Sequence, residues 1–275
     1  MWWHPGRCRG SLSPLLTRRY VNRTHNATSP ALSSSPTRSL TSGSLNYPEA
    51  RSKDEHADVA SYIAYAERTG LDVESNVFVG THYEYSVAEA LRHLGFDLRR
   101  VGGHSDKGID LLGTWSVPST PENLPLRVLL QCKAYSTAGT ARIGPHFIRE
   151  LEGAYVGAPA GWRGSGVIGL LVTQRPATKG IRDALAHSRW PLGYVSYSGE
   201  GVLQQMLWNQ RAEEEGLEGM GITAKLSNAD RQGGARGIAL TWKGRPYLPL
   251  STMPASKTED VKSTQETEAD TKPAI

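Results

Sequence analysis

The sequence predicts an α/β domain built on a mixed sheet of about five strands, with helices packed against it. Residues 167–173 form an unbroken apolar run, VIGLLVT, which is typical of a strand covered on both faces. Residues 81–94 carry apolar side chains at helical spacing and are followed by Gly95. Residues 96–101 and 109–115 flank a Gly-Gly turn and predict a hairpin.

The remaining elements follow from the same periodicities and alternate between helix and strand. Before the hairpin, residues 58–69 predict a helix that ends at Gly70. After the hairpin, the expected elements are a strand at 127–134, helices at 144–155 and 179–188, a strand at 192–197, a helix at 202–216, and a final hairpin at 222–226 and 238–242. The last helix and hairpin form an appended C-terminal extension of the core.

The two ends of the chain differ in composition from its middle. The first 48 residues contain six Arg and nine Ser but no Lys, Asp or Glu, which is typical of a mitochondrial presequence. A disordered tail of biased composition is the alternative. Residues 251–275 have almost no large apolar side chains and cannot offset the entropy of ordering, so they predict a disordered tail.

The formal net charge of +4 comes from the ends of the chain. Residues 49–250 hold 22 basic and 22 acidic side chains, so any nucleic-acid surface must be a local patch. No apolar run approaches the roughly 18 to 20 residues that a membrane span needs. The two cysteines, Cys8 and Cys132, are too few for a disulfide framework or for a zinc site made of cysteines.

These changes in composition and pattern divide the chain into five segments. They are a presequence at 1–48, a helical lead-in at 49–79, the sheet-bearing core at 80–200, a helix and hairpin extension at 201–250, and a disordered tail at 251–275. The presequence predicts a mitochondrial protein, and the matrix is the expected compartment.

Three polar side chains come together if the strands at 109–115 and 127–134 pair. Asp110 lies at the start of the first strand, and Gln131 and Lys133 share one face near the end of the second. Carboxylate and amide oxygens can hold a divalent cation, which offsets the charge on a phosphate and lowers the pKa of an attacking water. A lysine can orient that water or stabilise developing charge. This set of side chains suits cleavage of a phosphodiester.

Glu84 lies on the apolar face of the helix at 81–94, which is unusual for a carboxylate that only solubilises a helix. It is a candidate to assist at the same site. Taken one at a time, the residues have simpler interpretations: Glu84 could pair with an arginine, Asp110 could cap a turn, and Lys133 could extend from a strand end. The functional interpretation depends on their occurring together.

This pattern resembles the PD-(D/E)xK nucleases, in which an acid on one strand is followed by D/E/Q-x-K on the next. Mrr-type restriction enzymes use the glutamine variant, as in Gln131-Cys132-Lys133 here. The stretch Asp106-Lys107-Gly108-Ile109-Asp110-Leu111 and the upstream Glu84 match the same enzymes, and the resemblance covers about residues 80–200. The presequence and Trp242-Lys243-Gly244-Arg245-Pro246 further resemble the fungal mitochondrial proteins named for being required for respiratory growth, which carry this fold.

The resemblance implies a restriction-endonuclease-like fold and a role for each matched residue. Asp110 would be the main metal ligand, Gln131 a second ligand through its amide oxygen, and Glu84 an assisting ligand. Lys133 would be the catalytic lysine, and Mg²⁺ the cofactor, with Mn²⁺ as the alternative. Because glutamine is neutral, metal affinity should be lower than in relatives with an acid at that position. Asp106 is expected to shape the turn before the strand.

Arg99, Arg100 and Lys107 flank this set and are the best candidates for contacts with a nucleic-acid backbone, DNA being favoured over RNA. A homodimer is compatible with this interpretation. Two weaker groupings are a metal cluster of His104, Asp106 and Asp110, and a phosphate contact made by His146 with Arg142 and Arg149.

Three functions follow, in order of preference. The first is metal-dependent cleavage of DNA in mitochondria, with a role in genome maintenance and respiratory growth. The second is a nucleic-acid-binding or assembly factor that keeps the fold without useful catalysis, which the neutral core and Gln131 both allow. The third is a structural accessory of the respiratory or translation machinery.

Overall fold

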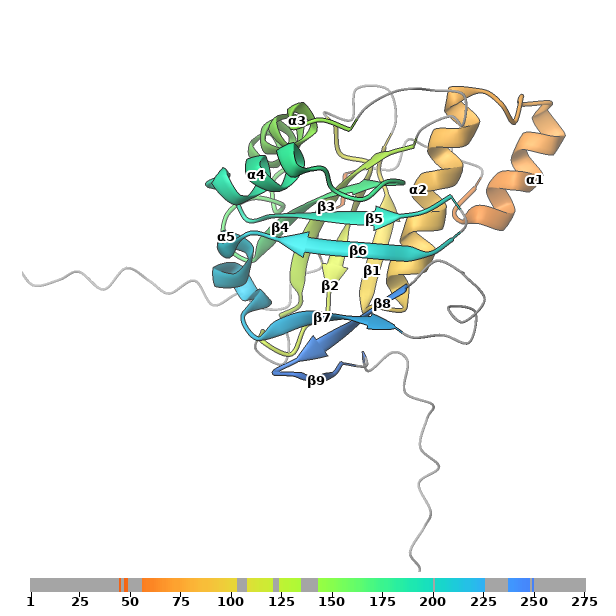
Figure 1. Ribbon diagram of the computed structural model, residues 1–275. Coiled ribbons are helices and arrows are strands. Elements are labelled where there is room, and N and C mark those ends of the chain that lie inside the picture. The colour runs from red at the N-terminus through yellow and green to blue at the C-terminus, as the bar shows by residue number, and fades with distance from the viewer. Residues whose placement is uncertain are drawn as a thin grey trace, which may run out of the picture. The chain divides into compact units, whose positions relative to one another are not determined.

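A six-stranded mixed sheet with helices on both faces is the central feature of the computed structural model (Figure 1). The structure describes residues 45, 47–48, 56–102, 108–120, 124–134, 143–199, 201–225, 237–247 and 249. The predicted tail at 251–275 and nearly all of the predicted presequence lie outside these residues. The predicted α/β class with a mixed sheet is confirmed.

The strands of this sheet follow the order of the chain from one edge to the other. They are β1 (Phe96–Arg100), β2 (Leu111–Trp115), β3 (Leu126–Lys133), β4 (Val167–Thr173), β5 (Leu192–Tyr197) and β6 (Leu203–Trp208). The pairs β1–β2, β2–β3 and β5–β6 are antiparallel, whereas β3, β4 and β5 run parallel. The predicted β1–β2 hairpin is confirmed, and all seven residues of β4 are buried, as its apolar run predicts.

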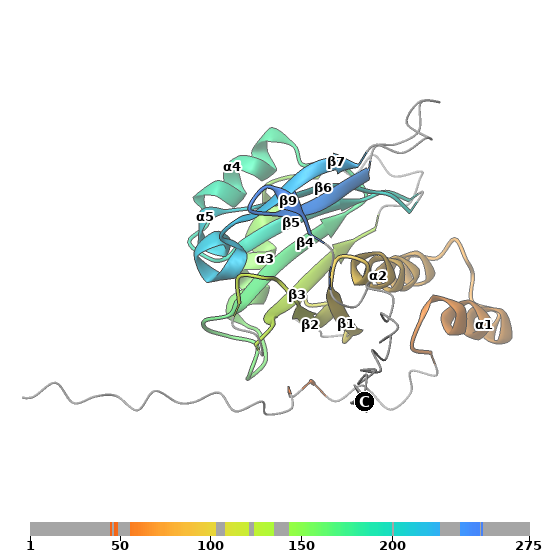
Figure 2. The ribbon, with the colours of Figure 1, turned by 90° about the horizontal axis from the view of Figure 1, so that it is seen from below.

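Helices cover the sheet on both sides, as the view from below also shows (Figure 2). They are α2 (Asn76–Arg92), α3 (His146–Val156), α4 (Lys179–His187) and the short α5 (Gln210–Ala212), which continues into a π-helical turn. The first helix, α1 (Val59–Thr69), packs against α2. Val87 and Leu91 of α2 pack on one face of the sheet. Ile148 of α3 and Ile181 of α4 pack on the other face. The two faces therefore have separate cores.

The first two helices have well-formed N-terminal caps. The Asp58 carboxylate accepts a hydrogen bond from the Ser61 N–H at 2.7 Å, which starts α1 where expected. The Ser75 hydroxyl accepts from the Phe78 N–H at 3.2 Å, so α2 begins at Asn76, five residues before the predicted start. No helix in the described part of the chain is both long and apolar enough to cross a membrane.

The helix predicted for residues 202–216 is wrong over its first half, where the structure has the strand β6. Met206 of β6 lies opposite Val195 of β5 and joins the core on the α2 side. Asn209 then ends the strand, because its side-chain amide bonds to backbone groups at the start of β5 and caps α5. Pairing with a neighbouring strand outweighs local helical spacing in a segment this short.

A second, smaller sheet follows α5. It consists of β7 (Met220–Lys225), β8 (Gly237–Trp242) and β9 (Arg245–Pro246), all antiparallel. The predicted final hairpin is confirmed, although residues 226–236 lie outside the described part of the chain. Met220 and Leu240 join the core on the α2 side of the large sheet, so the appended sheet shares a core with the rest of the fold.

The close approach of β1 and β2 depends on Gly113. A Cβ at this position would lie 1.9 Å from the Asp97 carbonyl oxygen. We expect Gly113→Ala to lower the free energy of unfolding by more than about 3 kcal/mol, because the two strands must separate to admit the methyl group. Urea denaturation followed by circular dichroism measures this change.

Gly153→Ala on α3 is the matched control. An added Cβ there meets nothing within 4 Å, and alanine favours a helix over glycine by about 1 kcal/mol. This variant should therefore be slightly more stable than the wild type. Equal stability losses in both variants would contradict the β1–β2 register.

Candidate metal-binding site

Asp110 stands where the pairing of β2 and β3 ends, and hydrogen bonds hold both its backbone and its side chain. Its N–H donates to the Leu130 carbonyl at 2.9 Å, and its carbonyl accepts from the N–H groups of Val101 and Gly102 at 2.8 and 2.9 Å. Its Oδ2 accepts from the Cys132 N–H at 2.6 Å. The carboxylate thus occupies the place of the next carbonyl in the ladder, which fixes its orientation.

Glu84 of α2 meets Asp110 over Gly102. A Cβ on Gly102 would lie 3.3 Å from Asp110 Oδ1 and 3.3 Å from Glu84 Oε2, so the two oxygens are within twice that distance of each other. The glycine leaves a space between them where other residues would carry a side chain. The structure therefore brings together two of the predicted site residues, one from a helix and one from a strand end.

Arg100, the last residue of β1, is the ion-pair partner of Glu84. Its Nε donates to Glu84 Oε2 at 2.6 Å, and each of the two side chains is 13% exposed. Its Nη2 also lies 3.4 Å from Thr81 Oγ1. The simpler interpretation of Glu84, pairing with an arginine, is thus realised. Glu84 can bind a cation only if this contact is shared or broken.

Gln131 is buried on β3 next to Asp110. Leu111 and Leu130 are the last facing pair of the β2–β3 register, and the Asp110 N–H still bonds to the Leu130 carbonyl, so Gln131 is the first β3 residue beyond the regular pairing. The Gln131 side chain is buried, and its Nε2 lies 3.0 Å from where a Cβ on Gly108 would be. Its Oε1 is the one buried side-chain polar atom without a hydrogen-bond partner in the described part of the chain. A buried acceptor without a hydrogen bond lowers the stability of the fold by about 1–3 kcal/mol, and a bound ligand would remove this cost.

Lys133 shares the β3 face of Gln131, and its ammonium contacts α3. Its Nζ lies 3.3 Å from Glu150 Oε2 and 5.3 Å from the centroid of the Phe147 ring. The Lys133 and Glu150 side chains are 30% and 46% exposed, so solvent screens the pair and it contributes at most about 1 kcal/mol. Lys133 therefore has a partner that the sequence did not indicate, held by a weak interaction.

Cys132 lies between Gln131 and Lys133 and packs on the α2 side of the sheet. Burial raises the pKa of its thiol well above the ordinary value, and the negative charges of Asp110 and Glu84 raise this pKa further. The positive charge of Lys133 acts in the opposite direction. The thiol stays protonated and packs as a small apolar group, as predicted.

The donor set fits a divalent cation that prefers oxygen ligands. Mg²⁺ is usually bound through one or two carboxylates, with water completing its octahedral shell. Asp110 and Glu84 supply carboxylate oxygens on either side of the space over Gly102, and Gln131 supplies an unpartnered amide oxygen. Within the described ranges, no group of three or more His, Cys, Asp or Glu could hold a metal. A site made from these residues therefore needs Gln131 as its third ligand.

The structure describes only some of the other predicted site residues. Arg99 lies over the ring of Tyr47, with its guanidinium carbon 4.4 Å from the ring centroid, and its contact with a nucleic acid stays a prediction. His146 is exposed and packs against the Phe147 ring, and Arg149 is exposed on the same helix. His104, Asp106, Lys107 and Arg142 lie outside the described residues.

Sequence reasoning missed Gly102 and Glu150 as parts of this site. Gly102 was interpreted only as a turn residue, although the Gly-Gly pair stands shortly before Asp110 and could have indicated a close approach of side chains. Glu150 gave no such signal, because its contact with Lys133 depends on how α3 packs on the sheet.

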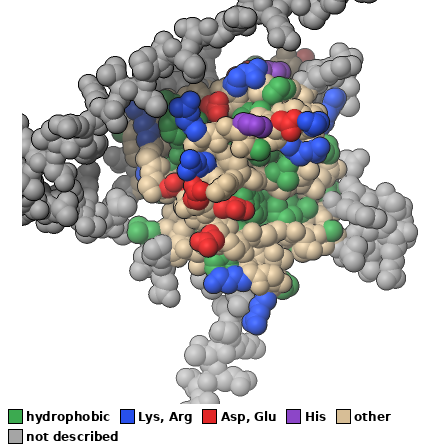
Figure 3. Space-filling model, turned by 60° about the vertical axis from the view of Figure 1, so that its left-hand side comes forward, with side chains coloured by type: hydrophobic (Ala, Val, Ile, Leu, Met, Phe, Trp, Pro, Cys, Tyr) green, Lys and Arg blue, Asp and Glu red, His purple; other side chains and the backbone are tan. Residues whose placement is uncertain are grey.

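Positive and negative side chains are interspersed over the face shown in Figure 3, which brings forward the left-hand elements of Figure 1. This agrees with the equal numbers of basic and acidic side chains in residues 49–250. Attraction for a nucleic acid on this face would therefore have to come from individual groups rather than from a broad basic surface.

A protein-family model matches this chain over residues 75–125 and 120–226, which together make up more than half of its length. The model describes Required for respiratory growth protein 7. The chain belongs to this family. Glu84, Asp110, Gln131 and Lys133 all lie within the matched residues.

Curated relatives place this family in mitochondria. An uncharacterized mitochondrial protein of Schizosaccharomyces pombe is 31% identical over 160 residues, which cover 57% of this chain and 61% of the relative, less than two thirds of its length. The mitochondrial Required for respiratory growth protein 7 of Saccharomyces cerevisiae is 25% identical over 173 residues, covering 48% of this chain and 69% of the relative. The predicted mitochondrial location is thus confirmed, and placement in the matrix stays a prediction.

One solved structure also resembles this chain, that of the MspJI restriction endonuclease in complex with a 27-mer oligonucleotide. The two share 19% identity and a TM-score of 0.32, covering 52% of this chain and 29% of that one. A score this low supports no argument about activity.

The unpartnered amide of Gln131 makes a prediction about stability. We expect Gln131→Leu to raise the free energy of unfolding by about 1 kcal/mol in EDTA, because it removes a buried oxygen that has no donor. Urea denaturation measures the change. Such a gain is typical of residues kept for binding or catalysis.

Gln205→Leu on β6 is the control, because Gln205 Oε1 accepts a hydrogen bond from the Ala177 N–H at 2.8 Å. Its loss should lower stability by about 1 kcal/mol. If both variants lost stability to the same extent, Gln131 would be an ordinary structural residue.

Proposed function

We propose that this chain is a metal-dependent nuclease that hydrolyses phosphodiester bonds of DNA in mitochondria, in a genome-maintenance role. The observation that carries the proposal is the meeting of Asp110 Oδ1 and Glu84 Oε2 over Gly102, one strand away from the unpartnered Gln131 Oε1. The order of these residues on helix, strand and strand matches the PD-(D/E)xK pattern that the sequence resembles. Membership of a mitochondrial family required for respiratory growth fits this setting.

Asp110 and Gln131 would hold Mg²⁺ or Mn²⁺, and Glu84 would join them when Arg100 shifts. A bound divalent cation offsets charge on the scissile phosphate and lowers the pKa of an attacking water. The hydrogen bond from the Cys132 N–H keeps the Asp110 carboxylate in one orientation without using Oδ1. The proposed ligand Asp110 is therefore held in place, whereas Glu84 of α2 would have to change its partner to join the site.

Lys133 is the candidate catalytic lysine. In hydrolysis the water oxygen bonds to phosphorus while the bond to the leaving oxygen breaks, and negative charge develops on the phosphate oxygens and on the leaving oxygen. An ammonium group can orient the water or stabilise that charge. Lys133 must leave Glu150 to do so, which the partly exposed position of both side chains makes inexpensive.

A nucleic-acid-binding or assembly factor without useful catalysis is the second candidate. The ion pair between Arg100 and Glu84 favours it, because a guanidinium already neutralises a carboxylate that a metal would need. In that case Asp110→Asn would leave the cellular function intact, whereas loss of the Arg99 charge would impair it. A purely structural accessory would tolerate both changes and would bind no nucleic acid.

The decisive assay is cleavage of labelled DNA by the full-length chain in Mg²⁺ or Mn²⁺. We expect Asp110→Ala and Lys133→Ala each to slow cleavage by at least about 100-fold, because they remove a metal ligand and the lysine that acts on the phosphate. Lys179→Ala is the matched control, since Lys179 is exposed on α4 and pairs only locally with Asp183.

Metal-dependent cleavage that both site variants lose and Lys179→Ala retains would support the enzyme. Absence of cleavage of several DNA and RNA forms by the folded wild-type protein would favour the binding or assembly factor. Cleavage that survives in Asp110→Ala would assign the activity to another site or to a contaminant.

A further inference from the structure

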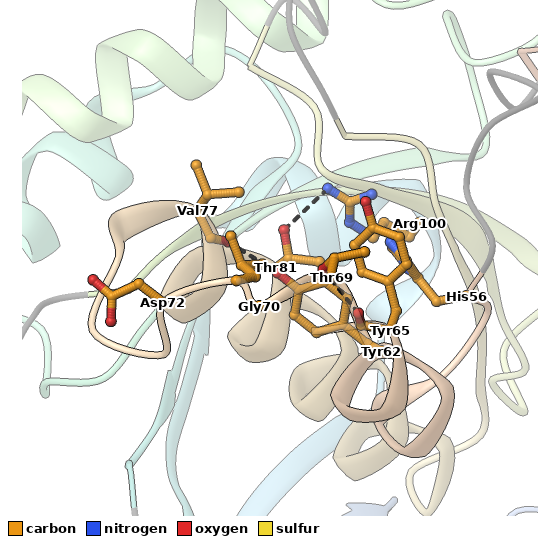
Figure 4. A pocket seen from close by; sticks show the side chains of 10 residues that line it. His56, Tyr62, Tyr65, Thr69, Gly70, Asp72, Val77, Thr81 and Arg100 are labelled. Carbon is orange, nitrogen blue, oxygen red and sulfur yellow. Dashed lines mark hydrogen bonds between the residues drawn. The ribbon is translucent and has the colours of Figure 1, made fainter. Parts of the chain in front are cut away.

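A pocket with a volume of about 500 Å³ lies between α1 and α2 and reaches Arg100 at the end of β1 (Figure 4). Its lining includes the rings of His56, Tyr62 and Tyr65 and the guanidinium of Arg100. The volume falls within the range of small-molecule binding sites. Neither the candidate metal site nor the packing of the sheet explains this combination of side chains.

The aromatic wall of the pocket is built from rings in mutual contact. The Tyr62 and Tyr65 rings are nearly parallel, with centroids 6.3 Å apart, and the His56 ring lies 4.7 Å from Tyr62 and 5.1 Å from Tyr65. Tyr62 is 2% exposed and backs the wall, whereas His56 and Tyr65 are partly exposed. A planar ligand can therefore stack on the outer rings without disturbing the inner one.

The polar groups of the pocket are unevenly placed. Arg100 and the Thr81 hydroxyl lie together, joined by the 3.4 Å contact drawn in Figure 4, and they form a cationic, hydrogen-bonding end. The exposed Asp72 lies in the segment that follows α1, which also lines the pocket. A ligand that matches both parts has an aromatic ring at one end and an anionic group at the other. A nucleotide has this form, because every base has a π-face and carries a phosphate through its sugar.

We propose that this pocket binds one nucleotide unit, with its base against Tyr65 and His56 and its phosphate on Arg100. This assignment rests on the proposed function for the source of the nucleotide, which would be the nucleic-acid strand at the neighbouring metal site.

Arg100 connects the pocket with the candidate metal site. The same guanidinium that lines the pocket donates to Glu84 Oε2 at 2.6 Å. A phosphate in the pocket competes with Glu84 for Arg100, because both are anionic acceptors for its donors. Binding of a nucleotide would thus release Glu84 toward Asp110 at the time when a substrate strand is present.

The test is a calorimetric titration of the full-length chain with deoxyadenosine 5′-monophosphate in EDTA, which requires neither metal nor cleavage. Tyr65→Leu should weaken binding by about fivefold or more, because it removes a stacking ring while keeping an apolar side chain. Tyr65→Phe should restore it. Ile63→Ala is the matched control, since Ile63 is exposed on α1 and does not line the pocket.

Deoxyribose 5-phosphate, which lacks the base, should bind at least about fivefold more weakly than the nucleotide. Equal binding of the two ligands, equal binding by wild type and Tyr65→Leu, or no saturable binding would each overturn the proposal. The result is separable from the nuclease assay, because Asp110→Asn should lose cleavage but bind the nucleotide at least as tightly as the wild type, since the released Glu84 then meets no second carboxylate. Nucleotide binding without cleavage would refute only the nuclease, and cleavage without nucleotide binding would refute only the pocket.

Discussion

The hydrogen bond between the Cys132 N–H and Asp110 Oδ2 is the constraint on which the candidate site depends. It substitutes a side-chain carboxylate for a backbone carbonyl at the point where β2 and β3 separate. Because the Asp110 backbone also bonds to β3 and to the two residues that follow β1, the position of its second oxygen is set by the end of the sheet. Gln131 lies on β3 between Leu130 and Cys132, whose backbone groups bond to Asp110, so the end of this strand pair determines the placement of two proposed ligands.

Arg100 is the second determinant, because it stabilises the resting state of the site. Two carboxylates this close would repel each other, and the partly buried guanidinium offsets that repulsion. Under the proposed function, Asp110 and Gln131 would hold a cation while Arg100 remains on Glu84, and Glu84 would join them when a competing anion draws the arginine away. A neutral residue at position 131 adds no further negative charge to these two carboxylates, which only one guanidinium faces in the absence of metal.

Much of this could be predicted from the sequence, because it follows from short-range patterns. The apolar run at 167–173 and the strand at 192–197 were matched residue for residue, and period-two spacing placed Gln131 and Lys133 on one face. The strand β6 was missed because its partner β5 and the cap at Asn209 are tertiary features. The choice of Arg100 as the partner of Glu84 depended on how α2 crosses the end of β1, which no local pattern encodes.

The most direct test of the central claim is the binding of Mn²⁺ to the full-length chain, with the free ion followed by electron paramagnetic resonance. The account predicts one saturable site in the wild type, its loss in Asp110→Asn, and its retention in Glu89→Gln, which alters an exposed carboxylate of α2. Equal binding by the wild type and Asp110→Asn, or no binding by either, would contradict a metal site at the separation of β2 and β3.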